Sequence, residues 1–90
     1  MQHATLTIYG KVQGVFFRDA TRRKAEECGI FGYVRNDING TVHIEAEGTK
    51  AALMAFIDWC RIGPSDAIVE NVKITEGPVA GFRRFEIRYI

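Results

Sequence analysis

The stretch GKVQGVFFR, residues 10–18, joins a strand-like run to a helix-like run and carries two glycines within five residues. Glycine lets the backbone turn sharply, and Arg18 falls at the first turn of the helix that follows. Backbone N–H groups at a helix start have no partner inside the helix and lie at the positive end of its dipole, so they favour an anion. Together with the planar, permanently charged guanidinium of Arg18, they predict an oxyanion cradle suited to phosphate.

An alternative interpretation of this stretch is a plain glycine-rich connection whose arginine points into water. Short Gly-x-x-x-Gly segments are common in turns, and on spacing alone the two interpretations are equally supported. The choice between them depends on what the rest of the fold brings next to Arg18.

Hydrophobic periodicity predicts a strand before this stretch and a helix after it. Residues 4–9 alternate between apolar and polar side chains, as a half-buried strand does. Residues 19–28 are rich in helix formers, and Gly29 ends them as a residue just beyond a helix C-terminus would.

A hairpin is predicted next along the chain. Residues 30–36 and 41–47 are both strand-like, and Asn39-Gly40 between them is a strong hairpin signal, because such a turn needs positive φ angles. The alternation of the second run assigns its residues to two faces: Val42, Ile44 and Ala46 inward, and His43, Glu45 and Glu47 outward.

The rest of the chain predicts a second helix and two further strands. Thr49 is a plausible N-cap for an amphipathic helix over 50–62. Residues 67–75 are strand-like, but Val69 is out of phase with the other apolar positions, which indicates a β-bulge. Residues 82–89 alternate again and form a short terminal strand.

This order, βαββαβ plus a short C-terminal strand, predicts an α+β, ferredoxin-like split β-α-β sandwich. We expect an antiparallel sheet with two helices on one face. In this fold the first two strands are parallel, with the third between them, and each crossover is right-handed. The segment containing Arg18 and the strand end at Asn36 therefore meet at one edge of the sheet, which favours the cradle.

Composition limits the protein to one compact unit. We expect a single domain over residues 1–90. A net charge of +1 does not suggest binding to nucleic acid or membrane, and the N-terminus shows no signal peptide. We therefore expect a cytoplasmic monomer. Cys28 and Cys60 are too few for a disulfide framework and are expected to be buried free thiols.

An arginine-lined amide cradle beside an asparagine suits hydrolysis of a small phosphorylated compound, because a carboxamide can hold a water in line for attack. The sequence offers no nucleophile paired with a base, no carboxylate cluster for Mg²⁺ and no Walker A motif. We therefore expect an activated substrate, such as a mixed carboxylic–phosphoric anhydride, and no cofactor.

The motifs along the chain closely resemble those of the acylphosphatase family. GKVQGVFFR at 10–18 is similar to the first family motif, G-x-V-Q-G-V-x-F-R. GYVRN at 32–36 and GTVHIEAEG at 40–48 are similar to the second, and FEIRY at 85–89 to the family's C-terminal ending. The resemblance covers essentially the whole chain.

The resemblance implies metal-independent hydrolysis of acyl phosphates to carboxylate and inorganic phosphate, the latter also an inhibitor. It implies that Arg18 binds the phosphate and that Asn36 orients the nucleophilic water, with the substrate phosphate acting as base. The phosphate-binding residues that we expect are Gln13, Gly14, Val15, Phe16, Phe17 and Arg18. Gln13 is expected to act through its backbone N–H. Either Phe16 or Phe17 walls the site while the other packs inward, and the sequence leaves this open.

Two other functions deserve a test. The ferredoxin-like sheet also serves the RNA recognition motif, but such a module needs exposed aromatic and basic residues on its central strands. Here the strand over 41–47 would expose His43, Glu45 and Glu47, which argues against RNA. The second alternative is an anion-sensing domain, because the cradle alone would bind phosphate without turnover.

Overall fold

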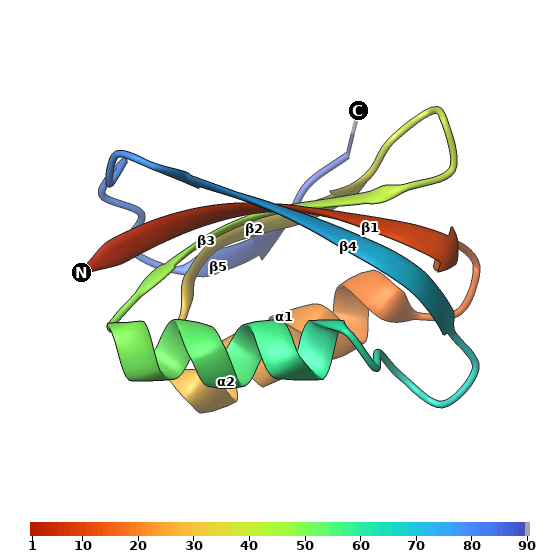
Figure 1. Cartoon of the computed structure of the whole chain (residues 1–90), viewed down its shortest axis with the longest axis horizontal. Coiled ribbons are helices and arrows are strands. Elements are labelled where there is room, and N and C mark those ends of the chain that lie inside the picture. Colours follow the sequence, from red (N-terminus) through yellow and green to blue (C-terminus); the bar gives the residue numbers. More distant parts are fainter. Residues whose placement is uncertain (90) are drawn as a thin grey trace.

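The computed structural model describes residues 1–89, in which two helices cover one face of a five-stranded sheet (Figure 1). The elements are β1 (Gln2–Lys11), α1 (Phe17–Cys28), β2 (Phe31–Asn36), β3 (Val42–Gly48), α2 (Lys50–Cys60), β4 (Ile68–Gly77) and β5 (Phe85–Ile87). The strand order is β4-β1-β3-β2-β5, so β3 lies between β1 and β2 as predicted. This confirms the α+β, ferredoxin-like architecture.

The sheet is mixed, whereas the sequence predicted an antiparallel one. The pairs β1–β3, β1–β4 and β2–β3 are antiparallel, but β5 pairs in parallel with β2. The reason is the route of the chain after β4. The connection between β4 and β5 crosses from one edge of the sheet to the other along a single end (Figure 1), so β5 leaves that end in the direction of β2.

The core lies between the helices and the sheet. As predicted, Val42, Ile44 and Ala46 of β3 are fully buried. Both helices contribute one apolar side to this core, Phe17, Thr21 and Ala25 from α1 and Leu53, Phe56 and Cys60 from α2. Burying one large apolar side chain contributes about 1.5–3 kcal/mol, so this layer holds the helices on the sheet.

The outward face of β3 differs from the prediction. His43 and Glu45 are half-buried and Glu47 is fully buried, although all three were expected to face water. The loop after β4 folds over Glu47, whose carboxylate accepts hydrogen bonds from the N–H groups of Gly81 and Phe82 at 3.0 and 3.1 Å. Alternation predicts the face on which a residue lies, but not whether a distant loop covers that face.

The β-bulge predicted from Val69 is present. The pairing of β1 with β4 shifts register between Tyr9, which faces Asn71, and Gly10, which faces Val69. Gly10 has a φ of 125°, and a Cβ there would lie 2.1 Å from the carbonyl oxygen of Ile68. Only glycine fits this close approach, which turns the chain out of β1 and into the loop before α1.

The ends of the helices and the hairpin follow the local sequence. Gly29 ends α1 with a φ of 74°, and the hydroxyl of Thr49 accepts a hydrogen bond from the Ala52 N–H at 3.2 Å as the N-cap of α2. α2 ends at Cys60, two residues before the predicted end. Between β2 and β3, Gly40 has a φ of 91°, and the Asp37 N–H bonds the Thr41 carbonyl oxygen at 2.9 Å.

Within residues 1–89, no helix has the length and apolar character to span a membrane.

Candidate active site

Three strands, β1, β2 and β5, finish at the same end of the sheet, and a pocket lies there. β1 and β2 point the same way because both are antiparallel to β3, and β5 is parallel to β2. A pocket of about 500 Å³ opens at these ends. Its lining residues come from the loop before α1, the first turn of α1 and the ends of β2 and β5: Val12, Gly14, Phe16, Phe17, Arg18, Asp19, Asn36, Ile87 and Tyr89.

The start of α1 lines this pocket and leaves backbone N–H groups outside the helical hydrogen-bond ladder. Gly14 and Phe16 both have positive φ, 73° and 61°, and they turn the chain from β1 into the helix. The Ala20 N–H bonds the Phe16 carbonyl oxygen at 3.1 Å and so begins the hydrogen-bond ladder of α1. The N–H groups before Ala20 precede that ladder, and the hydrocarbon side chain of Phe16 cannot cap them. The helix start therefore keeps donors available for an anion.

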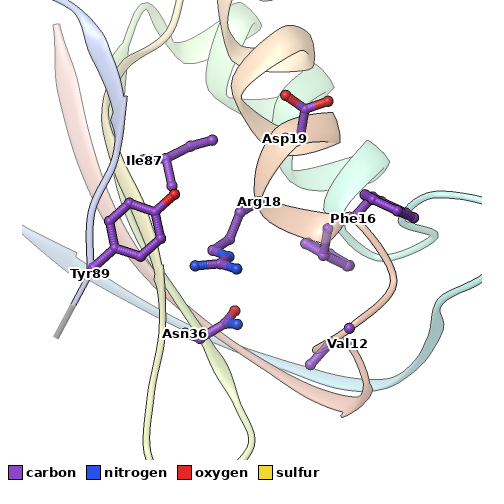
Figure 2. A pocket seen from close by; sticks show the side chains of 9 residues that line it. Val12, Phe16, Arg18, Asp19, Asn36, Ile87 and Tyr89 are labelled. Atoms are coloured by element: carbon purple, nitrogen blue, oxygen red, sulfur yellow. The ribbon is translucent and has the colours of Figure 1, made fainter.

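Arg18 reaches from this first turn into the pocket, toward Asn36 (Figure 2). Its guanidinium carbon lies 5.1 Å from the centre of the Tyr89 ring. A cation over an aromatic face is attracted by the ring. The planar fork of guanidinium N–H groups can donate to two oxygens of one anion.

Asn36 is the last residue of β2, and its side chain points at the guanidinium of Arg18 (Figure 2). Its Oδ1 atom is buried and has no hydrogen-bond partner among the described residues. An unpaired buried acceptor costs about 1–3 kcal/mol, so proteins rarely keep one without a use. Here it can accept a hydrogen bond from a water or ligand beside Arg18.

Four of the six predicted phosphate-binding residues line the pocket, and the other two do not. Gly14, Phe16, Phe17 and Arg18 line the pocket. Val15 is buried in the core. Gln13 donates from its side-chain amide to the carbonyl oxygens of Asp37 and Thr41, at 2.8 and 2.9 Å, and so ties the loop to the hairpin beyond Asn36.

The question that the sequence left open for the two phenylalanines has a clear answer. Phe17 is 2% exposed and packs its ring against Trp59 of α2, with 5.9 Å between the ring centres. Phe16 is 81% exposed at the pocket. Phe17 therefore packs inward, and Phe16 stands at the entrance.

Sequence reasoning missed the contribution of the chain's end and of the first turn of α1. Ile87 and Tyr89 line the pocket, as do Val12 and Asp19. A usable signal was present for the first two, since a terminal strand beside β2 and parallel to it must end at the same rim as Asn36. The prediction of an antiparallel sheet hid that signal.

Asp19 is the carboxylate among these lining residues, and two arginines hold it. A guanidinium nitrogen of Arg22 lies 3.3 Å from Oδ1 of Asp19, and the guanidinium of Arg23 donates to Oδ2. The hydrogen bond from Arg23 is the main cause that lowers the pKa of Asp19 below its ordinary value. Asp19 therefore stays ionised and is a weak base. Across residues 1–89, no group of three or more His, Cys, Asp or Glu side chains has an arrangement that could hold a metal ion.

Comparisons with known proteins agree on one family. The acylphosphatase family model matches residues 4–87. The chain is 46% identical to an acylphosphatase of Syntrophus aciditrophicus, over 99% of this chain and 94% of the relative. It is also 46% identical to one of Rubrobacter xylanophilus, over 90% of this chain and 74% of the relative.

The solved structures give the same answer. The crystal structure of acylphosphatase from Bacillus subtilis superimposes with a TM-score of 0.96 at 33% sequence identity, covering 99% of this chain and all of the other. The match of family model, sequence and fold extends over nearly the full length, so this chain belongs to the acylphosphatase family.

Proposed function

We propose that this chain hydrolyses the mixed anhydride of acyl phosphates to carboxylate and inorganic phosphate, with Arg18 holding the phosphate and Asn36 orienting the attacking water. Acyl phosphate hydrolysis is the activity of the family (EC 3.6.1.7). The observation that carries the assignment of roles is the pairing of Arg18 with the unpartnered Oδ1 of Asn36 across one pocket at a helix start.

Binding of the phosphate group draws on two sources of positive charge. The free edge of the Arg18 guanidinium can donate two parallel hydrogen bonds to phosphate oxygens. The N–H groups at the start of α1 can donate to the same group and lie at the positive end of the helix dipole. The Arg18 guanidinium carbon lies 5.1 Å from the centre of the Tyr89 ring, and this contact can position the guanidinium before substrate arrives, which lowers the cost of ordering it.

The water is positioned by Asn36. Its Oδ1 accepts one hydrogen of the water and directs a lone pair at phosphorus, in line with the bond to the acyl oxygen. As the water oxygen bonds to phosphorus, the bond between phosphorus and the acyl oxygen breaks and a carboxylate leaves with the electron pair. A carboxylate is a good leaving group, so the step does not need a covalent intermediate.

The proton of the water goes to a phosphate oxygen of the substrate. The carboxylate among the lining residues, Asp19, is held by Arg23 with its pKa lowered, so it accepts a proton poorly. This phosphate oxygen is bonded to the phosphorus atom that the water attacks, so it always lies next to the water. We therefore propose substrate-assisted proton transfer and no requirement for a metal ion.

Hydrolysis of acetyl phosphate in ¹⁸O-labelled water with EDTA present tests this function. We expect turnover well above the uncatalysed rate, the label in phosphate rather than in acetate, and competitive inhibition by inorganic phosphate. Label in acetate would place the attack at carbon and contradict the role of Asn36. Turnover lost in EDTA and restored by Mg²⁺ would contradict the metal-free step, and phosphate binding without turnover would identify an anion-sensing domain.

A further inference from the structure

Gln13 belongs to the loop before α1, yet it is not among the residues that line the pocket. Its half-buried side chain crosses to the hairpin between β2 and β3. There its Nε2 atom donates to two carbonyl oxygens, those of Asp37 and Thr41, at 2.8 and 2.9 Å. The two hydrogens of one amide nitrogen match these two acceptors. Gln13 thus joins the loop to a turn that lies 24 to 28 residues further along the chain.

The two acceptors close the end of the hairpin. The Thr41 carbonyl oxygen also accepts from the Asp37 N–H at 2.9 Å, and the Asp37 carbonyl oxygen also accepts from the Gly40 N–H at 3.2 Å. Gln13 supplies the donor that comes from outside the hairpin. Asn36 is the last residue of β2 and directly precedes Asp37. The amide of Gln13 therefore holds the backbone immediately after Asn36.

The carboxamide of Asn36 depends on this backbone for its position. Its Oδ1 has no hydrogen-bond partner among the described residues, so no bond to this atom fixes where it lies. The pairing of β5 with β2 stops at Val34, so within the described residues only Val42 of β3 pairs with Asn36. Support at the end of β2 therefore comes from β3 and from Gln13.

The phosphate side of the pocket has anchors of its own. Val15 and Phe17, just before Arg18, are buried, at 5% and 2% exposed. The ring of Phe17 also packs against Trp59 of α2, with 5.9 Å between the ring centres. The helix start and Arg18 are therefore held on the core independently of the hydrogen bonds from Gln13 to the hairpin.

We infer that Gln13 is a positioning residue, whose side-chain amide sets the place of Asn36 relative to the phosphate-binding start of α1. The inference rests on the proposed function, since it assumes that Asn36 orients the attacking water. This role is separate from the phosphate contact that the sequence predicts for the backbone N–H of Gln13. In-line attack needs the reacting atoms close and aligned, and a misplacement of about 1 Å can cost about 10²-fold in rate. A released hairpin should therefore lower kcat more than it weakens phosphate binding.

The experiment measures kcat with acetyl phosphate and the inhibition constant of inorganic phosphate in variants of Gln13. Gln13→Met keeps the length of the side chain but loses both donors. Gln13→Asn keeps the amide but is one methylene group shorter. We expect both to lower kcat by about 10-fold and to change the inhibition constant by less than about 2-fold. Gln2→Met, on the exposed start of β1 outside this pocket, is the matched control and should change neither quantity.

A double-mutant cycle with Asn36→Ala separates positioning from a general loss of structure. Residues that act through one another show non-additive effects, whereas independent residues add. Without the Asn36 carboxamide, Gln13 has nothing to position. Gln13→Met should therefore lower kcat by less than about 2-fold in the Asn36→Ala background. An equal loss of about 10-fold in both backgrounds would assign Gln13 a general structural role and overturn the inference.

The outcomes distinguish this inference from the function on which it rests. A wild-type chain without turnover, or a normal kcat in Asn36→Ala, overturns the proposed function and the role of Gln13 with it. If the wild-type chain is active and Asn36→Ala is impaired, but both Gln13 variants keep a normal kcat, the inference alone fails. Urea denaturation checks that each variant folds. Gln13→Asn carries the test if Gln13→Met does not fold, and failure of both to fold would show a structural role and contradict the inference.

Discussion

The two ends of the sheet gather backbone N–H groups around an anion position in different ways. At the end where β1 begins, Ala80, Gly81 and Phe82 donate their N–H groups to the carboxylate of Glu47. At the other end, the first turn of α1 lines a pocket that holds Arg18, and the first N–H groups of the helix precede its hydrogen-bond ladder. Figure 1 shows the two ends apart, with the loop between β4 and β5 at one and the beginning of α1 at the other.

The two ends of the sheet differ in the source of the negative charge. Glu47 is fully buried, and the His3 ring lies 2.7 Å from it, so the chain satisfies this cluster of N–H groups by itself. A carboxylate with several N–H donors fixes a loop, which is a structural role. At the pocket, the carboxylate in the first turn of α1, Asp19, is already held by Arg22 and Arg23, so an external anion can complete the arrangement of the helix start and Arg18. The same backbone chemistry holds a loop at the end of the sheet that contains Glu47, here called the closed end. It is proposed to bind substrate at the end that contains Arg18, here called the open end.

Removing the charge at the open end should give the largest effect. Arg18→Ala deletes a guanidinium that contacts phosphate in both ground and transition states, so we expect kcat/KM to fall about 10³-fold, or about 4 kcal/mol, with KM raised and kcat lowered. Steady-state kinetics with acetyl phosphate measures this. Arg22→Ala is the matched control, because Arg22 lies on the same helix outside the pocket. Equal losses in both variants would contradict a specific role for Arg18.

Removing the charge at the closed end should affect stability instead. Glu47→Ala leaves three backbone N–H groups and His3 without their acceptor, so we expect the free energy of unfolding to fall by about 3 kcal/mol. Urea denaturation measures it. Glu47→Gln keeps an oxygen acceptor and should lose less. If Glu47→Ala folds with unchanged stability but loses activity, the division of roles between the two ends is wrong.

Removing the neutral partner at the open end should separate chemistry from binding. Asn36→Ala deletes the side chain proposed to orient the water but keeps Arg18, so we expect kcat to fall about 10²-fold with little change in the inhibition constant of inorganic phosphate. Asn71→Ala, on an exposed part of β4, is the matched control. Near-normal kcat in Asn36→Ala would refute the water-orienting role.

The contrast between the two ends also shows which features of the structure can be predicted from the sequence. Element order, the burial of Val42 and Ile44, the bulge near Val69 and the meeting of Arg18 with Asn36 at one edge all follow from periodicity, glycines and the handedness of crossovers. These features depend on local pattern and on a topology with few alternatives. The open end was therefore predictable in outline.

The closed end was not predictable, because it depends on a long loop. Nothing in the alternation of β3 distinguishes Glu47 from Glu45, and only the path of the chain after β4 buries the former. The same path turns β5 parallel to β2 and brings Tyr89 to Arg18. Loop paths depend on tertiary contacts that a periodic pattern does not encode, so the residues delivered by that loop were missed.

The cluster around His3 carries charges of both signs, and this sets how its stability responds to pH. Burial alone lowers the pKa of His3, but its hydrogen bonds to Glu47 and Glu45 outweigh burial and raise the pKa above 6.5. Burial alone raises the pKa of Glu47, but the N–H groups of the loop and His3 outweigh it and lower the pKa below 4.5. Burial also raises the pKa of Glu45, but its hydrogen bonds with Thr5, His3 and His43 outweigh burial and lower that pKa below 4.5.

The smallest expected effect is therefore a stability maximum set by the closed end. A raised His3 pKa stabilises the folded state fully below pH 6.5, and this contribution is lost as pH rises through the raised value. The lowered pKa values of Glu45 and Glu47 stabilise it above pH 4.5, and that contribution is lost as pH falls through the lowered values. The contribution of this cluster should thus be greatest between about pH 4.5 and 6.5. Urea denaturation from pH 4 to 9 should show the decline on the alkaline side, and His3→Gln should remove that decline while leaving the acid side in place. A wild-type stability that keeps rising above pH 6.5, or an alkaline decline that survives in His3→Gln, would mean that the loop is held by the N–H groups and Glu47 alone.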